Sequence, residues 1–339
     1  MKTDDQNQAD LSVIIPAYRA GGSICRALAS VAAQTRKPLE VIVIDDGSDD
    51  DTLEVATGMQ EKMGPISLKV LTQENAGAGA ARNRGLAEAR ATFVAFLDAD
   101  DEWLPEKIDQ SMSRIEDGEH VLVAHNFTRV EQDGSESIID CNRRFLQASD
   151  PFAALYRQGF IGTSTVVARR QALVQAGGFD ETLATAQDFD LWLKALKDPA
   201  VRFTIFPDVL TRYHVSANSI TTFTARRLAC TLCIAERHFP ALMERNGKGL
   251  MNLWKRIVAV HYEAFSAYRN TGRFIAAPCS VLSLPWHLVR LSVFTTGAAN
   301  PAPDWLRTLL WVWVIAAFGA YMFRFQHLVQ AALNMVARI

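Results

Sequence analysis

Four short clusters of side chains that can bind cations or move protons stand at, or just after, segments expected to be strands. They are Asp45-Asp46, Asp98-Ala99-Asp100-Asp101, Asp188-Phe189-Asp190 and Tyr213-His214. In an open α/β sheet, the carboxyl ends of the strands form the edge where ligands bind. We therefore expect these clusters to lie around one binding site.

The cluster Asp98-Ala99-Asp100 follows the apolar run 93–97 and offers two carboxylates at positions i and i+2. Two such carboxylates past a strand end can converge on one hard cation. Oxygen ligands of this kind suit Mg²⁺ or Mn²⁺ shared with substrate phosphates. The competing interpretation is an acidic turn before a helix that starts near Pro105, because Asp-x-Asp alone has many chance matches.

The glycine-rich segment Gly77–Arg82 is a poor match to a dinucleotide-binding loop. It lacks the third glycine, and it follows the third expected strand instead of the first. The first strand ends in Pro16-Ala17-Tyr18 without Gly-x-Gly-x-x-Gly, and the sequence has no Walker A lysine motif. A Rossmann oxidoreductase and a P-loop NTPase are therefore both disfavoured.

The elements that must position these residues alternate between apolar strands and helices. We expect strands over 11–16, 39–44, 68–71 and 92–97, and helices over 22–34, 51–62, 76–90 and 104–116. This rhythm predicts an α/β fold with a mostly parallel sheet and helices on both faces. Further on we expect strands over 121–130, 137–140, 163–168, 201–206 and 209–214, and helices over 151–159, 170–176 and 187–196.

Charge divides the 339-residue chain into two parts. Residues 1–244 carry 25 Lys+Arg against 35 Asp+Glu, a net charge of −10, and residues 245–339 carry 10 against 2, a net charge of +8. The acidic front argues against nucleic acid as a partner, and we expect a boundary near 220–245. Residues 1–10 read as a disordered lead. Five irregularly spaced cysteines and a polar, acidic N-terminus without a signal peptide favour the cytoplasm.

The basic C-terminal region, 222–339, is expected to be helical over 222–245, 249–270, 274–295 and 304–337. Its apolar segments are about 281–297 and 308–323, and the second has 16 residues without a charge. A helix of that length spans about 24 Å, short of the roughly 30 Å hydrocarbon core. Three interpretations of this segment therefore stay open: an interfacial helix, a membrane span with snorkelling arginines, and a soluble helical subdomain or oligomer contact. The basic composition predicts association with an anionic membrane surface.

Five segments within residues 11–221 share one family pattern, in this order: SVIIPAYRAGG, EVIVIDDGSDDDT, QENAGAGAARNRGLAEARATFVAFLDADDEW, TSTVVARRQALVQAGGFDETLATAQDFDLWLKAL and TRYHVSANSIT. In them the chain resembles the family 2 glycosyltransferases, which have the GT-A fold; the resemblance does not cover the C-terminal third. It implies transfer of a hexosyl or N-acetylhexosaminyl group, with inversion, from a nucleotide-diphosphate donor to a hydroxyl. UDP-sugar is the expected donor.

The resemblance also implies roles for matching residues. The nucleotide pocket is expected to use Pro16, Ala17, Tyr18 and Asp46, with Asp46 accepting a hydrogen bond from the base. The loop beside it is expected to use Asn75, Gly77, Arg82 and Asn83. Asp98 is expected near the ribose or the metal, Asp100 as principal ligand of Mn²⁺ or Mg²⁺, and His214 near the metal or diphosphate. The cation stabilises the charge that grows on the diphosphate.

Asp188 matches the catalytic base of the family. An acceptor hydroxyl has a pKa far above 7, and a positioned carboxylate typically accelerates its attack about 10²- to 10⁴-fold. The family usually has Glu before this Asp, whereas this chain has Gln187, and Asp190 is the competing base. The other interpretation is a helix N-terminus that carries acids. Thr163 and Ser164 are expected on a strand that faces the acceptor.

Together, the resemblance and the basic tail predict a glycan or polyprenyl-linked acceptor for bacterial surface polysaccharide, at the cytoplasmic face of the inner membrane. An oligomer is compatible with the sequence. Two other hypotheses remain. A nucleotidyltransferase would need a basic, glycine-rich loop where this chain has Tyr18-Arg19-Ala20-Gly21-Gly22. An inactive nucleotide-sugar-binding or scaffold protein has Gln187 as its only support.

Overall fold

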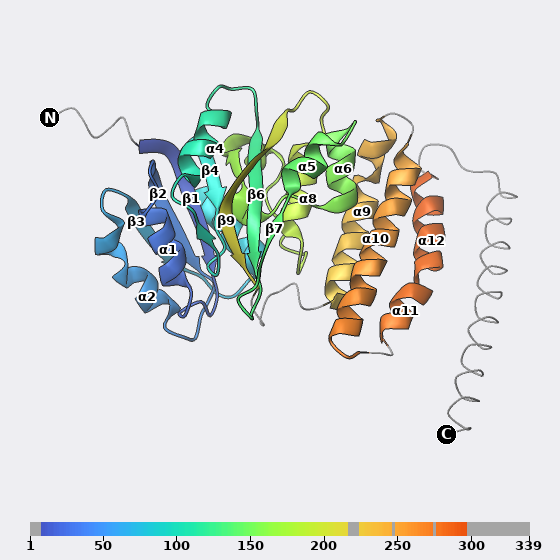
Figure 1. Ribbon diagram of the computed structural model, residues 1–339, viewed down its shortest axis with the longest axis horizontal. Helices are drawn as coiled ribbons and strands as arrows, with labels where there is room; N and C mark the ends of the chain where they lie inside the picture. Colours follow the sequence, from blue (N-terminus) through green and yellow to red (C-terminus); the bar gives the residue numbers. More distant parts are fainter. Residues whose placement is uncertain (1–7, 216–223, 246–247, 274–275, 297–339) are drawn as a thin grey trace, which may run out of the picture. The chain divides into compact units, whose positions relative to one another are not determined.

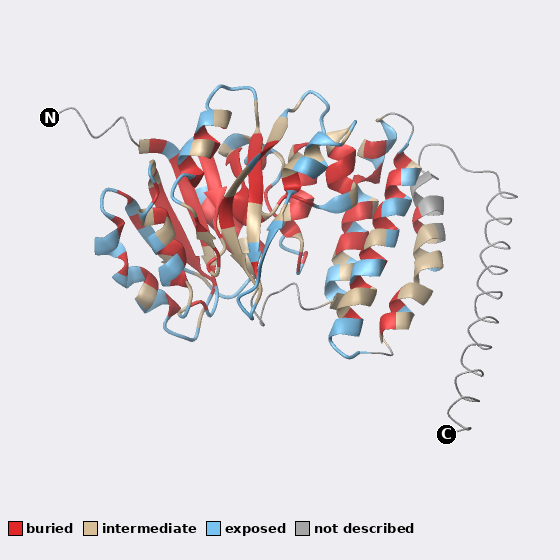
Figure 2. Cartoon of the chain, viewed as in Figure 1, coloured by how far each residue is buried: buried red, intermediate tan, exposed pale blue. Residues whose placement is uncertain are grey.

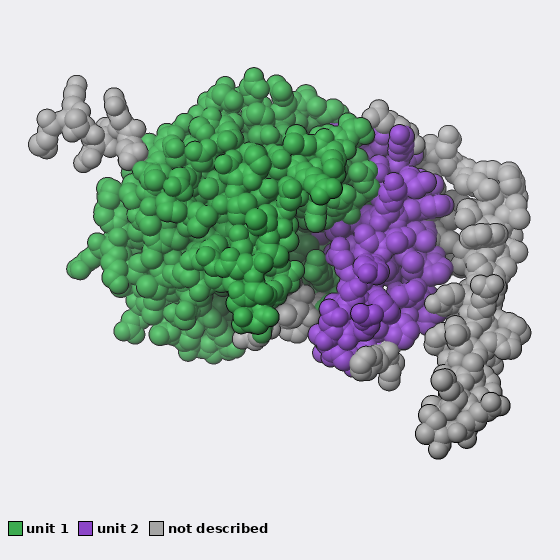
Figure 3. Space-filling model, in the orientation of Figure 1, with its two compact units in different colours: residues 1–230 green, residues 231–339 purple. Residues whose placement is uncertain are grey.

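The computed structural model describes residues 8–215, 224–245, 248–273 and 276–296 (Figure 1). The chain forms two compact units, residues 1–230 and residues 231–339 (Figure 3). This division lies inside the 220–245 interval in which charge and pattern change along the sequence. The segment 308–323, expected to contact a membrane, lies outside the described residues.

The first unit is built on a nine-stranded sheet with the order β3-β2-β1-β4-β8-β6-β9-β5, and β7 pairs with β6. Its strands are β1 (Gln8–Ala17), β2 (Lys37–Asp45), β3 (Ser67–Thr72), β4 (Phe93–Phe96), β5 (Glu102–Trp103), β6 (Leu122–Val130), β7 (Glu136–Ile139), β8 (Val167–Arg169) and β9 (Phe203–His214). Its helices are α1 (Ile24–Ala32), α2 (Thr52–Gly58), α3 (Ala78–Glu88), α4 (Lys107–Ile115), α5 (Cys141–Leu146), α6 (Pro151–Gln158), α7 (Arg170–Gln175) and α8 (Gln187–Ala195), with 3₁₀ turns η2 (Gln60–Met63) and η3 (Thr163–Thr165).

The sheet is mixed, so the expectation of a mostly parallel sheet is wrong. Parallel pairs join β1 to β2 and β4, β2 to β3, and β6 to β9. Antiparallel pairs join β8 to β4 and β6, β5 to β9, and β7 to β6. The β-α-β rhythm ends after β4, and antiparallel strands need no long crossover. Only the first half of the sheet therefore follows the pattern that the sequence displays.

Four element boundaries differ from expectation. The first strand begins at Gln8, which pairs with Lys37, so residues 8–10 belong to the sheet and not to a disordered lead. The two strands expected over 201–214 form one strand, β9, whose register shifts at Pro207, a residue without a backbone N–H. Residues 163–165 form a 3₁₀ turn instead of the start of a strand. The short elements β5 and α5 were not expected.

Helices cover both faces of the sheet, as the sequence predicts. On β1, Leu11, Val13 and Ile15 pack into a cluster that includes residues of α1, α2 and α4. On the opposite face Ile14 meets α3 at Gly85, where a Cβ atom would come within 2.4 Å of the Ile14 side chain. Figure 2 shows the buried strands between these layers. The strand ends are thereby held at fixed positions.

Lys107 of α4 is completely buried in the first unit. Its Nζ lies 3.9 Å from the centre of the Trp103 ring and donates a hydrogen bond of 3.3 Å to the carbonyl oxygen of Val166. Burial lowers the pKa of this amine well below its usual value. At pH values between the lowered pKa and the ordinary lysine pKa, the unfolded chain therefore holds a proton that the folded chain lacks.

We predict that Lys107→Met raises the free energy of unfolding by about 1–3 kcal/mol, because methionine keeps the buried stem and removes the amine. The stability of the wild type should rise with pH between the depressed pKa of the folded state and the ordinary lysine value of about 10.4. The variant should lose that dependence. Urea unfolding of both proteins at several pH values measures the effect, and a destabilised variant at every pH would contradict it.

Between residues 224 and 296, the described part of the chain forms four further helices: α9 (Thr224–Met243), α10 (Gly249–Asn270), α11 (Ala276–Leu282) and α12 (Leu284–Thr296). The helix expected over 274–295 is broken at Ser283, two residues before Pro285, and proline favours the first turn of a new helix. In α10, Leu253, Ile257 and Val260 are buried on one face. None of the helices that the structure describes combines the length and the apolarity needed to cross a bilayer.

Candidate active site

The carboxyl ends of β1 and β2 meet at the edge of the sheet where the sequence places a nucleotide pocket. Pro16 and Ala17 end β1, and Tyr18 follows with 48% of its surface exposed. The backbone N–H of Asp46 donates to the carbonyl oxygen of Ala17 over 2.8 Å. Two segments expected to form the nucleotide pocket, 16–18 and 45–46, therefore lie side by side.

The buried carboxylate of Asp46 holds the loop between β3 and α3. It accepts hydrogen bonds from Gln73 Nε2 at 2.7 Å, from the N–H of Ala76 at 3.0 Å and from the N–H of Gly77 at 2.8 Å. Asn75 Nδ2 donates to the backbone oxygen of Asp46 at 2.9 Å. Gly77 has φ +90°, a value that favours glycine. These residues shape the loop, and their contact with a nucleotide stays a prediction.

Asn83 also has protein partners for its side chain. Its Nδ2 donates to the Phe179 carbonyl at 2.9 Å and to Glu181 Oε1 at 2.7 Å, while its Oδ1 accepts from the N–H of Phe179 at 2.8 Å. A Cβ atom on Gly178 would come within 2.6 Å of that Oδ1. Asn83 therefore fastens α3 to the loop before α8, and its role toward the nucleotide is untested.

Arg82 is the residue that joins the acidic clusters. Its buried guanidinium lies 2.5 Å from Asp98 Oδ1. Burial opposes the charged form, but the negative charges of Asp98, Asp188 and Asp100 outweigh it and raise the pKa of Arg82. Asp188 is distant in the sequence from Asp98 and Asp100, and the negative charges of all three carboxylates act on this one cation. Asp98 and Asp100 follow the end of β4, whereas Asp188 lies on α8, so the rule of strand ends accounts for two of the three carboxylates.

Asp188 lies in the first turn of α8, after Ala186, whose φ of +60° is unusual for a residue other than glycine. Thr163 Oγ1 donates a hydrogen bond of 2.6 Å to Asp188 Oδ2. Asp188 Oδ1 accepts from the N–H of Phe189 at 2.8 Å. The carboxylate is half-buried and oriented by neighbours, an arrangement suited to a general base.

Asp190, the competing base, has a different environment. It is completely buried, and its Oδ2 lies 2.7 Å from Lys194 Nζ, one turn further along the same helix. Two residues correspond to about 200° around a helix, so Asp188 and Asp190 point in nearly opposite directions. Asp190 therefore has an ion pair with Lys194 within α8, whereas the carboxylate of Asp188 accepts a hydrogen bond from Thr163.

Gln187 is buried, and its Nε2 donates to the Leu183 carbonyl at 2.8 Å. An ionised glutamate at this position has no N–H and could not make that bond. The amide thus stabilises the turn that leads into α8. Gln187 has a structural explanation, which weakens the hypothesis of an inactive protein that rested on it.

Asp101 is a site residue to which the sequence gave no separate role. It is completely buried; its Oδ2 accepts from Ser164 Oγ at 2.5 Å, and its Oδ1 accepts from the N–H of His214 at 3.1 Å. Ser164 Oγ in turn accepts from the N–H of Asp98 at 3.1 Å. Burial, followed by the charges of Asp98 and Asp100, raises the pKa of Asp101 well above its usual value. Asp101 therefore ties the acidic loop to η3 and β9.

We predict that Asp101→Ala lowers the free energy of unfolding by about 1–3 kcal/mol, because two buried donors lose their acceptor. Asp101→Asn should keep most of the stability: its oxygen can accept from His214 N–H, and its NH₂ can donate to Ser164 Oγ. Urea unfolding of the two variants and the wild type measures the difference. Equal stability of the alanine variant and the wild type would contradict the tie.

Three residues are expected to hold a cation: Asp98, Asp100 and His214. Within the described residues, one set of three potential ligand atoms lies within 4.8 Å, that of Asp117, Glu119 and His120, two of which are exposed. The expected set of Asp98, Asp100 and His214 is not gathered so closely, and His214 Nε2 lies 3.2 Å from Glu102 Oε1. Proteins often hold Mg²⁺ through one or two carboxylates plus substrate phosphates. Asp98 and Asp100 fit that mode, and all three ligand roles stay predictions.

The chain is similar to known proteins in sequence and in structure. The glycosyl transferase family 2 model matches residues 12–175. The amylovoran biosynthesis glycosyltransferase AmsB of Erwinia amylovora is 33% identical over 211 residues, which cover 60% of this chain and 69% of AmsB. The match spans less than half of some other curated relatives.

Two solved structures share the fold. TarS from S. aureus, in complex with UDP, superposes with a TM-score of 0.62 at 21% identity, covering 90% of this chain and 87% of TarS. The mannosyltransferase PcManGT from Pyrobaculum calidifontis, in complex with GDP-Man and Mn²⁺, gives 0.54 at 18% identity, covering 86% and 88%. At these identities the two structures show the fold alone. The family match and the relation to AmsB establish the class of the chain: it belongs to glycosyl transferase family 2 and is a glycosyltransferase.

Proposed function

We propose that this enzyme transfers a sugar, with inversion, from a nucleotide-diphosphate donor to a hydroxyl of a glycan acceptor in polysaccharide biosynthesis. The observation that carries the proposal is the arrangement of three carboxylates: Asp98 lies 2.5 Å from the buried Arg82, Asp100 follows it by two residues, and Asp188 is held by Thr163 through a hydrogen bond of 2.6 Å. Two of these carboxylates suit the donor diphosphate and its cation, and the third suits the acceptor hydroxyl. The relation to AmsB, an enzyme of amylovoran biosynthesis, supports the polysaccharide class.

On the donor side, the proposed nucleotide pocket is bordered by the loop that Asp46 holds and by the segment Asp98-Ala99-Asp100. We call these residues the nucleotide edge. Arg82 provides a buried positive charge at the nucleotide edge, where its guanidinium forms an ion pair with Asp98. A divalent cation bound by Asp98 and Asp100 would offset the negative charge of the leaving diphosphate. Arg82 fixes Asp98 in place and stabilises the negative charge gathered at this site.

On the acceptor side, Asp188 takes the proton of the attacking hydroxyl. The new bond from the acceptor oxygen to the anomeric carbon forms as the bond from that carbon to the diphosphate oxygen breaks, so the configuration inverts. Thr163 holds one oxygen of Asp188 through the 2.6 Å hydrogen bond. The other oxygen faces the N–H of Phe189, so the carboxylate keeps one orientation.

The donor we propose is a UDP-sugar with a hexosyl or N-acetylhexosaminyl group. The structure of TarS with UDP supports this base, and that of PcManGT with GDP-Man and Mn²⁺ supports a cation-dependent donor site. The proposed acceptor is a glycan, including one linked to a polyprenyl carrier at the cytoplasmic face of the inner membrane. The net charge of +8 on residues 245–339 and the uncharged segment 308–323 support membrane association.

A panel of nucleotide sugars tests the proposal. The full chain is incubated with each sugar nucleotide and Mn²⁺, and release of nucleoside diphosphate is measured with and without a glycan acceptor. One donor should give release that the acceptor accelerates, and NMR of the product should show the inverted anomer. Retention of configuration would overturn the mechanism, and no release from any donor would overturn the proposed donor class.

A further inference from the structure

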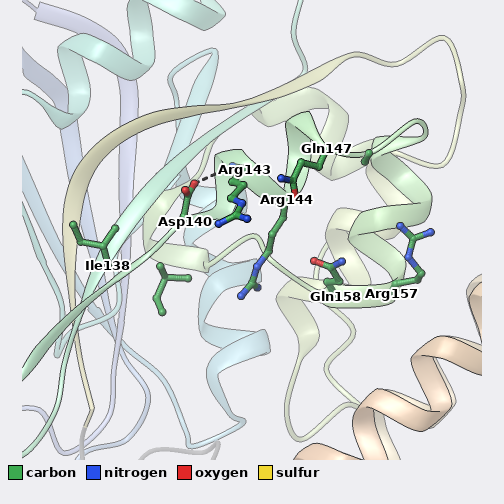
Figure 4. A pocket seen from close by; sticks show the side chains of 9 residues that line it. Ile138, Asp140, Arg143, Arg144, Gln147, Arg157 and Gln158 are labelled. Atoms are coloured by element: carbon green, nitrogen blue, oxygen red, sulfur yellow. Dashed lines mark hydrogen bonds between the residues drawn. The ribbon is translucent and has the colours of Figure 1, made fainter.

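A hollow of about 540 Å³ lies in the catalytic unit, apart from the residues of the nucleotide edge. It is bordered by the end of β7 and by helices α5 and α6 (Figure 4). Figure 4 shows Arg143 and Arg144 reaching it from α5, and Arg157 and Gln158 from α6. A volume of this size lies within the range of small-ligand sites. The hollow can therefore hold a molecule larger than a single ion.

The walls of the hollow combine cations with a small apolar surface. Arginines 143, 144 and 157 provide three positive charges, and Asp140 provides one negative charge. In the part of the chain that the structure describes, neither Arg143 nor Arg144 has an ion-pair partner. The remaining walls are formed by two amides and by apolar side chains: Gln147, Gln158, Ile138, Ile139 and Ala148.

The carboxylate of Asp140 does not cancel this charge. Its Oδ1 accepts from the backbone N–H of Arg143 at 2.9 Å and from Asn126 Nδ2 at 3.1 Å, so it caps α5. Three positive charges and one negative charge leave a net charge of +2. A phosphate monoester carries about −1.5 to −2 near pH 7, and the planar arginine fork matches its oxygens. The charge and geometry of the walls thus complement a phosphate better than a single carboxylate.

The position of the hollow links it to the acceptor half of the active site. Helix α6 packs against both α5 and α8, and α8 carries Asp188. Gln158 at the end of α6 precedes Thr163 by five residues, which limits the separation of their Cα atoms to about 18 Å. Thr163 is the residue that donates to Asp188. The hollow therefore lies within about 18 Å, counted between the Cα atoms of Gln158 and Thr163, of the residue that holds the proposed base.

We propose that this hollow binds a phosphate group of the acceptor and so selects phosphate-bearing acceptors. The inference rests on the proposed function, because it assumes that Asp188 marks the acceptor side. Binding of the phosphate by Arg143 and Arg144 would place the acceptor while leaving the donor site unchanged. The same chemistry could bind the headgroup of an anionic lipid, so the test separates these two sources.

The first measurement is calorimetric binding of inorganic pyrophosphate to the full chain in EDTA. We expect the affinity of Arg143→Gln/Arg144→Gln to be at least about tenfold lower than that of the wild type. The matched control is Lys62→Gln/Arg202→Gln, which removes two exposed charges elsewhere in the same unit and should bind like the wild type. Binding at the nucleotide edge would be common to all three proteins. Equal affinity in all three overturns the proposal.

The second measurement compares transfer to a sugar that carries a phosphate with transfer to its methyl glycoside. The wild type should have a lower KM for the phosphorylated acceptor. In Arg143→Gln/Arg144→Gln, called the pocket variant below, this preference in KM should fall at least about tenfold, with kcat largely retained. Donor hydrolysis without acceptor should be the same in both proteins. If neither the wild type nor the variant hydrolyses any donor, the proposed function is wrong. The pyrophosphate measurement still shows whether the hollow binds phosphate.

The third measurement asks whether the hollow binds the headgroup of an anionic lipid instead of the acceptor phosphate. The wild type and the pocket variant are sedimented with phosphatidylglycerol vesicles and with phosphatidylcholine vesicles. Equal binding of the two proteins to the anionic vesicles supports the proposal that the hollow binds the acceptor phosphate. The acceptor assignment is overturned if the variant loses vesicle binding and keeps the wild-type preference for the phosphorylated sugar.

Discussion

Replacing Asp188 with asparagine is expected to reduce sugar transfer by about 10²- to 10⁴-fold while donor affinity changes by no more than about twofold. The asparagine amide has nearly the same shape, and its oxygen can still accept the hydrogen bond from Thr163. It cannot take up the proton that the acceptor hydroxyl must lose. The loss should therefore appear in the rate of transfer and not in the binding of the nucleotide sugar.

Single-turnover transfer and calorimetric titration of the donor measure these two quantities separately. Asp190→Asn is the matched control, because it removes a carboxylate two residues away that is paired with Lys194. That variant should lose stability yet keep transfer within about tenfold wherever it is folded. Full transfer by the Asp188 variant, with loss of transfer in folded Asp190→Asn, would assign the base to Asp190.

Thr163→Val tests how far orientation contributes. Valine has the shape of threonine but cannot donate the 2.6 Å hydrogen bond to Asp188. Thr163 is a positioning residue in the proposed mechanism, so its loss should lower kcat less than loss of the base itself. A Thr163→Ser variant retains the hydroxyl and should recover most of the rate.

The acidic clusters could be placed from the sequence because each ends, or follows, a segment with a clear pattern. The buried runs before Asp45 and Asp98 leave little choice but a central strand, and strand ends in a β-α-β pattern share one edge. The first half of the fold and the positions of Asp45 and Asp98 at one edge follow from this rule, whereas Asp188 lies in the first turn of α8. The distances among these carboxylates and Arg82 required the packed structure.

The second half of the sheet could not be predicted in the same way. Strand β8 has three residues and lies between β4 and β6, which are its partners on both sides. Such pairing depends on contacts between distant parts of the chain, and a three-residue segment carries too little periodicity to reveal it. The tie of Asp101 to Ser164 and His214 was missed for the same reason, because it spans 63 and 113 positions.

Arg82 illustrates the limit at the level of a single residue. The sequence placed it in an alanine- and glycine-rich helix beside a loop expected to approach the nucleotide. The structure shows that small residues on α3, such as Gly79 and Gly85, allow close packing of this helix. The arginine is thereby held, buried, against Asp98. Its role as the common cation of three carboxylates therefore depends on packing that only the fold reveals.

Replacing Asp100 with alanine is expected to lower transfer at least about 10²-fold, and EDTA should do the same to the wild type. Asp100 is the better probe of the cation than Asp98. Removal of Asp98 would leave the buried guanidinium of Arg82 without its closest partner, and that loss would destabilise the fold. The Asp100 variant keeps the 2.5 Å ion pair, so a drop in its activity can be read as a loss of chemistry.

The decisive measurement is donor affinity with and without Mn²⁺. In the wild type, Mn²⁺ should tighten donor binding and restore transfer after EDTA treatment, whereas in Asp100→Ala the affinity should become independent of Mn²⁺. Asp109→Ala, which removes an exposed carboxylate of α4, should behave like the wild type. Full transfer in EDTA would show that Arg82 and its neighbours alone offset the charge on the diphosphate. In that case, the aspartates around Arg82 would serve to hold the guanidinium and to take the acceptor proton, and the cation would have no place in the reaction.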